Sequence, residues 1–150
     1  MPHHFQVGVK GIYIQNNKAL LLKFKRPDAS LTWDLPGGRI DRDESIADAF
    51  TREVNEEING IMQVQLRELL HAARAPGNFD DGTGLIWLFY SCHIDFTQLQ
   101  LRDEHIGIKW ATSQDLTWLA KDMSITLNQD FHLALTRAFD KRIALPTPKK

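Results

Sequence analysis

Glu53, Glu56 and Glu57 are the residues of this 150-residue chain whose types and spacing are best suited to chemistry. On a helix, residues spaced i, i+3 and i+4 share one face, where like charges destabilise the helix by about 0.2–0.5 kcal/mol per pair. A divalent cation bound between the carboxylates would remove that repulsion. Oxygen-only ligands suit the hard ions Mg²⁺, Mn²⁺ or Ca²⁺, whereas structural zinc prefers Cys and His. By itself, the spacing is more typical of the solvated face of an amphipathic helix.

The residues around these glutamates predict the helix that the spacing requires. Ser45, with Asp48 three residues later, is typical of a helix N-cap. Apolar residues then recur at helical spacing, namely Ile46, Ala47, Phe50, Val54 and Ile58. We therefore expect a helix over about residues 45–58, preceded by a glycine turn at Gly37 and Gly38.

The segment over residues 37–60 reads GGRIDRDESIADAFTREVNEEING. It resembles the Nudix box, written G-x5-E-x7-R-E-U-x-E-E-x-G-U with U a bulky aliphatic residue. The matching positions are Gly38, Glu44, Arg52, Glu53, Val54, Glu56 and Glu57. The segment departs from the box at Asn59, where the second glycine belongs, and at Gly60, where an aliphatic residue belongs. Because Asn also tolerates the left-handed conformation that ends many helices, we expect Asn59 or Gly60 to end this one.

The resemblance implies an α/β fold, the Nudix-type α/β/α sandwich with a central mixed sheet. It implies a pyrophosphohydrolase that cleaves a nucleoside triphosphate or another nucleoside diphosphate linked to a second group. The expected cofactor is Mg²⁺, with Mn²⁺ as an alternative, because metal ions neutralise phosphate oxygens and lower the pKa of bound water. The implied ligands are Gly38, Glu53, Glu56, Glu57 and Glu104, and one of the four glutamates is expected to be the general base.

Arg52 completes the implied catalytic set, and Glu44 with Gly37 is implied to be structural in the motif. In the family, the pair formed by Arg52 and Glu44 orients the ligands instead of touching substrate. From the residues alone, Arg52 lies four positions before Glu56, a spacing that also fits a surface ion pair. Such a pair would stabilise the helix by under about 1 kcal/mol. Gly37 and Gly38 fit a close approach of backbone to metal or phosphate, and also a plain tight turn after Pro36, and we favour both together.

Glu104 is a second acidic candidate, six residues before Trp110 in the segment DEHIGIKW. Many Nudix proteins carry another metal-binding or catalytic carboxylate at such a spacing. A loop glutamate in water is the alternative, and Asp103 is the fallback for the same role.

Arg26, Trp33 and Phe79 are candidates for substrate contacts, because aromatic rings stack on bases and arginine forks onto phosphate. Trp33 is equally suited to the core. The loop over residues 74–84, RAPGNFDDGTG, is polar, glycine-rich and long enough to shape a pocket. The same composition is also compatible with a hairpin loop that has no role in function.

The whole chain predicts one domain over residues 1–150, with a frayed tail from about residue 144. Strands are expected around an Asn16–Asn17 turn, with a mixed sheet between helical layers. The predicted strands cover residues 7–14, 19–24, 63–72, 85–94 and 106–111, and further helices cover residues 113–119 and 129–142.

Composition narrows the classes of partner. The net charge of −1 gives no basic field for a nucleic-acid polymer, so a small nucleotide or pyrophosphate-containing substrate is expected. No apolar run is long enough to span a membrane and no signal peptide precedes the first strand, so a cytoplasmic protein is expected. The sequence does not decide between a monomer and a homodimer. Cys92, the single cysteine, is expected to be a buried inert thiol.

The histidines match no zinc pattern, and neither a GxGxxG nor a Walker sequence is present. His71, His93, His105 and His132 are therefore interpreted as non-ligands. Two functions remain, an enzyme and a non-catalytic Nudix domain that senses a nucleotide. Arg52 together with Glu53, Glu56 and Glu57 favours the enzyme, because a pure binder has no evident need of the full set.

Overall fold

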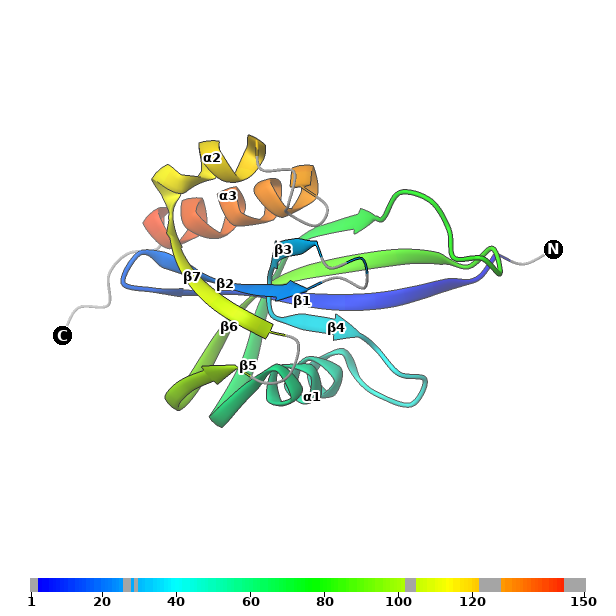
Figure 1. The fold of residues 1–150 in the computed structure, drawn as a ribbon, viewed down its shortest axis with the longest axis horizontal. Coiled ribbons are helices and arrows are strands. Elements are labelled where there is room, and N and C mark those ends of the chain that lie inside the picture. Colours follow the sequence, from blue (N-terminus) through cyan, green and yellow to red (C-terminus); the bar gives the residue numbers. More distant parts are fainter. Residues whose placement is uncertain (1–2, 26–27, 29, 102–104, 122–127, 145–150) are drawn as a thin grey trace.

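The structure is a computed structural model that describes residues 3–25, 28, 30–101, 105–121 and 128–144 (Figure 1). Its elements in chain order are β1 (Phe5–Gln15), β2 (Lys18–Lys25), β3 (Leu31–Asp34), β4 (Gly37–Arg39), α1 (Ile46–Glu57), β5 (Ile58–Arg74), β6 (Gly84–Leu101), β7 (His105–Thr112), a 3₁₀ turn (Ser113–Asp115), α2 (Leu116–Lys121) and α3 (Asn128–Ala144). No helix in these ranges is long and apolar enough to cross a membrane.

The strands form one mixed sheet in the order β3-β2-β1-β6-β5, with β4 also on β1 and β7 on β2. β1 runs parallel to β6 and antiparallel to β2 and β4. Figure 1 shows α1 on one side of the strands and α2 with α3 on the other. The predicted fold class, helices on both sides of a central mixed sheet, is confirmed.

Two apolar clusters fill the space between the sheet and the helical layers. Consecutive leucines on β2 contribute side chains to both clusters, because successive side chains of a strand point to opposite faces of the sheet. Leu21 belongs to the cluster beneath α3, whereas Leu20 and Leu22 belong to the cluster beneath α1. Phe50 and Val54 of α1 are fully buried in the second cluster, so the apolar face of the helix fixes the direction of its glutamates.

The predicted helix is present as α1, and Ser45 is its N-cap, with its Oγ accepting a hydrogen bond from the Asp48 N–H at 3.1 Å. The expectation that Asn59 or Gly60 ends this helix is wrong. The backbone adopts an extended conformation at Ile58 and continues directly into β5, because Ile58 pairs with Leu101 of β6. The positive φ of Gly60, 76°, lies inside that strand.

The remaining expected elements are present with different bounds. The Asn16–Asn17 turn is confirmed, and both residues have positive φ, 52° and 61°, as the tight hairpin turn requires. β5 and β6 are longer than predicted, and the short strands β3 and β4 were missed. The predicted helix over residues 113–119 is divided into the 3₁₀ turn and α2. The expected frayed tail lies outside the described residues, apart from the end of α3.

A buried ion pair holds the segment that leads into the glycine turn. Lys10 Nζ lies 3.0 Å from Asp34 Oδ2 and 4.6 Å from the centroid of the Trp87 ring, and the two charged side chains are only 9% and 12% exposed. Lys10 Nζ also donates to the Leu35 carbonyl at 3.4 Å, and Asp34 Oδ1 accepts from the Leu35 N–H at 2.7 Å. On the backbone, Lys10 is opposite Gly37 in the β1–β4 ladder.

Breaking this pair should destabilise the fold, because one charge would be left buried without a partner. We expect Lys10→Met to lower the free energy of unfolding by about 3–5 kcal/mol. The double variant Lys10→Met/Asp34→Asn should recover part of that loss, since the amide is neutral and keeps an acceptor for the Leu35 N–H. Urea denaturation measures both. A double variant no more stable than Lys10→Met would contradict the account.

Candidate active site

The glycine turn lies directly against the carboxylate face of α1. The Gly37 N–H donates to Glu57 Oε1 at 2.7 Å, and Glu57 is buried. Gly37 has a φ of 133°, and a Cβ added there would lie 2.0 Å from the Val9 carbonyl oxygen. Both the backbone conformation and the close approach therefore require glycine at this position.

Gly38 meets a second glutamate of the same helix. A Cβ added at Gly38 would lie 2.2 Å from Glu53 Cδ and 2.4 Å from its Oε2. The carboxylate of Glu53 occupies the space that any other side chain at position 38 would take. The two glycines thus bring the backbone of the turn and the helix carboxylates together, and the predicted approach to metal or phosphate stays a prediction.

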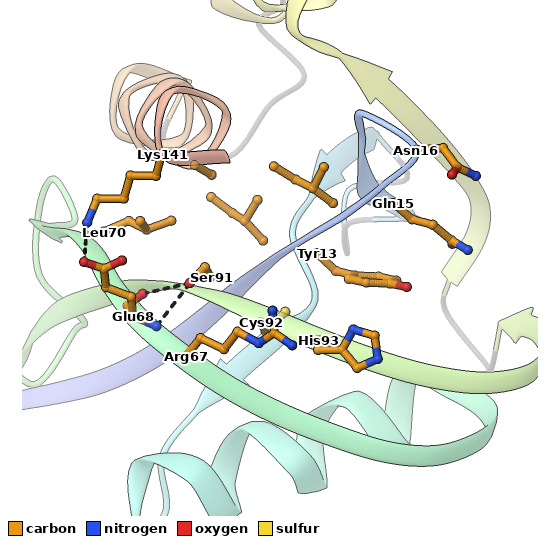
Figure 2. Close-up of a pocket in the computed structure, with 13 residues that line it drawn as sticks. Tyr13, Gln15, Asn16, Arg67, Glu68, Leu70, Ser91, Cys92, His93 and Lys141 are labelled. Atoms are coloured by element: carbon orange, nitrogen blue, oxygen red, sulfur yellow. Dashed lines mark hydrogen bonds and ion pairs between the residues drawn. The ribbon is translucent and has the colours of Figure 1, made fainter. Parts of the chain in front are cut away.

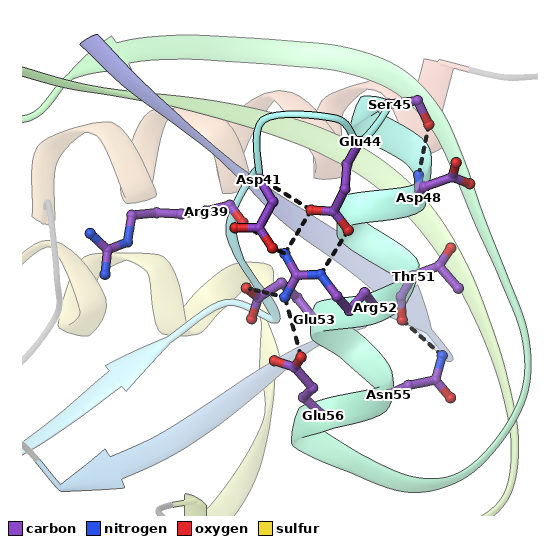
Figure 3. A network of polar contacts seen from close by, with 10 residues as sticks. All are labelled: Arg39, Asp41, Glu44, Ser45, Asp48, Thr51, Arg52, Glu53, Asn55 and Glu56. Carbon is purple, nitrogen blue, oxygen red and sulfur yellow. Dashed lines mark hydrogen bonds and ion pairs between the residues drawn. The ribbon is translucent and has the colours of Figure 1, made fainter.

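Arg52 is held by Glu44 through two hydrogen bonds, Nε to Oε2 at 2.7 Å and Nη2 to Oε1 at 2.8 Å (Figure 3). Glu44 also accepts from the Asp41 N–H at 2.9 Å, and Arg52 Nη2 donates to the Arg39 carbonyl at 3.1 Å. The hydrogen bonds from Arg52 and from the Asp41 N–H lower the pKa of Glu44 to about 2. The Glu44 carboxylate in turn raises the pKa of Arg52.

The other end of the Arg52 guanidinium reaches two of the predicted ligands. Nη1 donates to Glu53 Oε1 at 3.1 Å and to Glu56 Oε1 at 3.2 Å. The Glu53 side chain is 19% exposed and that of Glu56 is 58% exposed. Burial raises the pKa of Glu53, and the hydrogen bond from Arg52 opposes that shift. The Arg52 guanidinium therefore links Glu44 to two of the predicted ligands.

The local charge is strongly negative. Among the residues that the structure describes, Arg52 is the one cation paired with four carboxylates, those of Asp41, Glu44, Glu53 and Glu56, and Glu57 lies on the same helix. This excess of oxygen donors has the chemistry that a hard divalent cation requires. Within the described residues, no three Asp, Glu, His or Cys side chains converge as a ready metal cage. Glu53 and Glu56 point to Arg52, and Glu57 points to Gly37.

The structure describes two of the other predicted site residues, Phe79 and Trp33. Arg26, Glu104 and Asp103 lie outside the described residues, so their roles stay predictions. Phe79 is 39% exposed, and its ring lies 5.6 Å from the guanidinium carbon of Arg39.

Trp33 is half-buried against the cluster beneath α3, with Lys23 Nζ 5.1 Å from its ring centroid. Trp33 therefore packs at the edge of the core, and its contact with substrate stays a prediction.

Arg39 and Asp41 were not predicted from the sequence. Arg39 joins the Arg52 network through its carbonyl, while its side chain points away from the network, donates to Gln6 at 2.9 Å and lies against Phe79 (Figure 3). The position of Arg39 directly after the two glycines was the sequence signal that could have identified it.

Cys92 is buried as predicted, and this burial raises its pKa, which disfavours the reactive thiolate.

Comparisons with known proteins agree with this architecture. A family model described as "NUDIX domain" matches residues 3–130. The chain is similar in fold to the MutT protein from Methanosarcina mazei Go1, with a TM-score of 0.72 at 20% identity over 97% of this chain and 99% of that one. The E. coli ORF135 protein gives a TM-score of 0.71 at 20% identity, covering 97% and 96% of the two chains.

A shorter stretch is similar to a protein of Bacillus subtilis (strain 168) named "Putative 8-oxo-dGTP diphosphatase". The two are 46% identical over 46 residues. This match covers 31% of this chain and 30% of the length of the relative.

The lowered pKa of Glu44 makes a prediction about stability and pH. Its ordinary value is 4.5 and its value in the fold is about 2, so the stabilisation is complete above pH 4.5 and is lost as the pH falls towards 2. Glu44→Gln should therefore be less stable than the wild type at pH 7. The difference should shrink between pH 5 and pH 2 in urea denaturation. A difference that stays constant over that range would show that the charge of Glu44 is not what stabilises the fold.

Proposed function

This chain belongs to the NUDIX domain family, and we propose that it is a metal-dependent hydrolase of phosphoric anhydride bonds. Its proposed substrate is a nucleoside triphosphate or another nucleoside diphosphate linked to a second group. The names of the relatives support this class, since one is called a MutT protein and another refers to 8-oxo-dGTP. The sensing alternative has no specific support among the contacts described above.

The observation that carries the proposal is the packing of the glycine turn on α1. The Gly37 N–H donates to Glu57, and Gly38 leaves room for the Glu53 carboxylate. A helix whose glutamates were only a solvated face would not need such a turn, in which both positions exclude a side chain. The arrangement supports a site where backbone, carboxylates and a ligand meet.

Glu53, Glu56 and Glu57, with the backbone of Gly38, would hold Mg²⁺ or Mn²⁺. The donors fit these ions because all of them are oxygen atoms and because a single arginine cannot balance the carboxylates around it. When bound, the metal supplies charge neutralisation at the pyrophosphate and a water of lowered pKa. Glu104 is the proposed additional ligand.

The protein residues orient this chemistry. Glu44 stays ionised at neutral pH, since its pKa is about 2, and its two hydrogen bonds hold the Arg52 guanidinium in place. Arg52 then directs Glu53 and Glu56 from its other end. The proposed general base is one of the three helix glutamates or Glu104.

Substrate contacts are proposed beside the glycine turn. Phe79 offers a partly exposed ring for stacking, and Arg39 lies next to it with a guanidinium suited to phosphate. Trp33 and Arg26 are retained as weaker proposals for the same role.

The experiment that tests the function measures phosphate or pyrophosphate release from a panel of substrates. The panel contains nucleoside triphosphates, ADP-ribose, nucleotide sugars, dinucleoside polyphosphates and coenzyme A. Turnover should vanish after chelation and return with Mg²⁺ or Mn²⁺. Glu57→Gln should lower kcat by about 100-fold or more, because the amide keeps the shape and the acceptor for the Gly37 N–H but loses the charge.

Asp43→Asn is the matched control, because Asp43 is exposed in the loop before α1. It should keep the wild-type rate. Turnover that does not respond to chelation would refute the metal mechanism, and a wild-type rate for Glu57→Gln would remove Glu57 from the site. Nucleotide binding without hydrolysis of any substrate in the panel would favour the sensing alternative.

A further inference from the structure

A cavity of about 420 Å³ lies away from the glycine turn, between the end of β1, the middle of β5 and β6, and α3 (Figure 2). No residue of α1 or of the glycine turn lines it. Its volume falls within the range of roughly 300–1,000 Å³ that is usual for small-molecule sites. The proposed hydrolysis makes no use of this cavity.

The cavity follows from the way the sheet divides. β1 runs beside β6 as far as the pair Tyr13 and Cys92, and it then continues with β2, where Ile14 is opposite Ala19. β6 continues with β5 instead. The two pairs of strands separate at this point, and Ala138 and Lys141 of α3 lie over the opening.

A β-bulge on β5 places charged residues at the opening. The register of β5 on β6 shifts between Leu66 and Leu69. The Glu68 N–H there donates to the side-chain Oγ of Ser91 on β6 at 3.1 Å. Bulges redirect side chains and are common beside functional sites. This one brings Arg67 and Glu68 to the lining of the cavity.

The charge at the cavity is positive. Glu68 is paired with Lys141, so its charge is balanced. Among the described residues, the exposed side chain of Arg67 has no hydrogen bond or ion pair. Figure 2 shows its side chain extending beside Cys92 in the direction of His93. His93 Nε2 itself is hydrogen-bonded to Asp95 Oδ1 at 2.7 Å.

The opposite wall is apolar. Ile12, Leu70 and Ala138 are 1%, 6% and 6% exposed and line the cavity with their hydrocarbon surfaces. A ligand that fits both walls must carry a negative group for the guanidinium and an apolar body for this surface. Arginine binds carboxylate and phosphate oxygens with two parallel hydrogen bonds, which adds direction to the charge attraction.

We propose that this cavity is a binding site for a small organic anion with one carboxylate or phosphate group on a compact apolar body, and that Arg67 binds the anionic group. The site is separate from the glycine turn and does not depend on the proposed hydrolysis.

The test uses the fluorescent dye anilinonaphthalenesulfonate, which has an aromatic body and one anionic group, titrated into the full chain without metal. Wild type should bind the dye saturably. Arg67→Gln should weaken binding about tenfold or more, since a hydrogen bond to a charged group is lost. Arg67→Glu should weaken it further. Arg42→Gln, the same change at an exposed loop arginine, should leave the affinity unchanged.

Competition identifies the ligand chemistry. Naphthoate or naphthyl phosphate should displace the dye, whereas the uncharged naphthalenemethanol should be at least about tenfold weaker. The absence of saturable binding, or equal affinity of wild type and Arg67→Gln, would overturn the proposal. Displacement by inorganic pyrophosphate with no effect of Arg67→Gln would place the dye at the glycine turn and would also overturn it.

Discussion

The close packing of a two-glycine turn on the carboxylate face of α1 is the contact on which the proposed site depends. β1 holds the turn from one side, since the Gly11 N–H donates to the Pro36 carbonyl at 2.9 Å and Lys10 is opposite Gly37. Glu57 holds it from the other side through the Gly37 N–H. Because neither glycine has a side chain, the backbone reaches α1 at the point where its glutamates gather.

The charge balance around Arg52 explains how the helix tolerates so many carboxylates. A single guanidinium contacts Glu44 at one end, and Glu53 and Glu56 at the other. Glu44 is stabilised as an anion, whereas partial burial disfavours the charge of Glu53. The excess negative charge that remains is the property expected of a site that binds a divalent cation, and it gives the proposed metal a physical role in the fold as well as in hydrolysis.

Local signals in the sequence predicted the parts of the fold that depend on local interactions. Ser45 caps α1, and the Asn16–Asn17 turn joins β1 and β2. The direct entry of α1 into β5 was not predictable, because it depends on pairing with Leu101. The Lys10–Asp34 pair and the bulge at Arg67 likewise depend on residues distant in sequence. In the site, the sequence predicted that the three glutamates lie on one helix, but their hydrogen-bond partners depend on the fold, with Glu57 bound to Gly37 and the other two to Arg52.

The most direct test of the central claim is a calorimetric titration of Mn²⁺ into the wild type and into Gly38→Ala. The added Cβ would lie 2.2 Å from Glu53 Cδ, which belongs to a flexible side chain, so the carboxylate should move while the fold persists. The account predicts similar melting temperatures without metal and Mn²⁺ binding that is weaker in Gly38→Ala by about tenfold or more. Equal Mn²⁺ affinity in the two proteins, or no binding to the wild type, would contradict it.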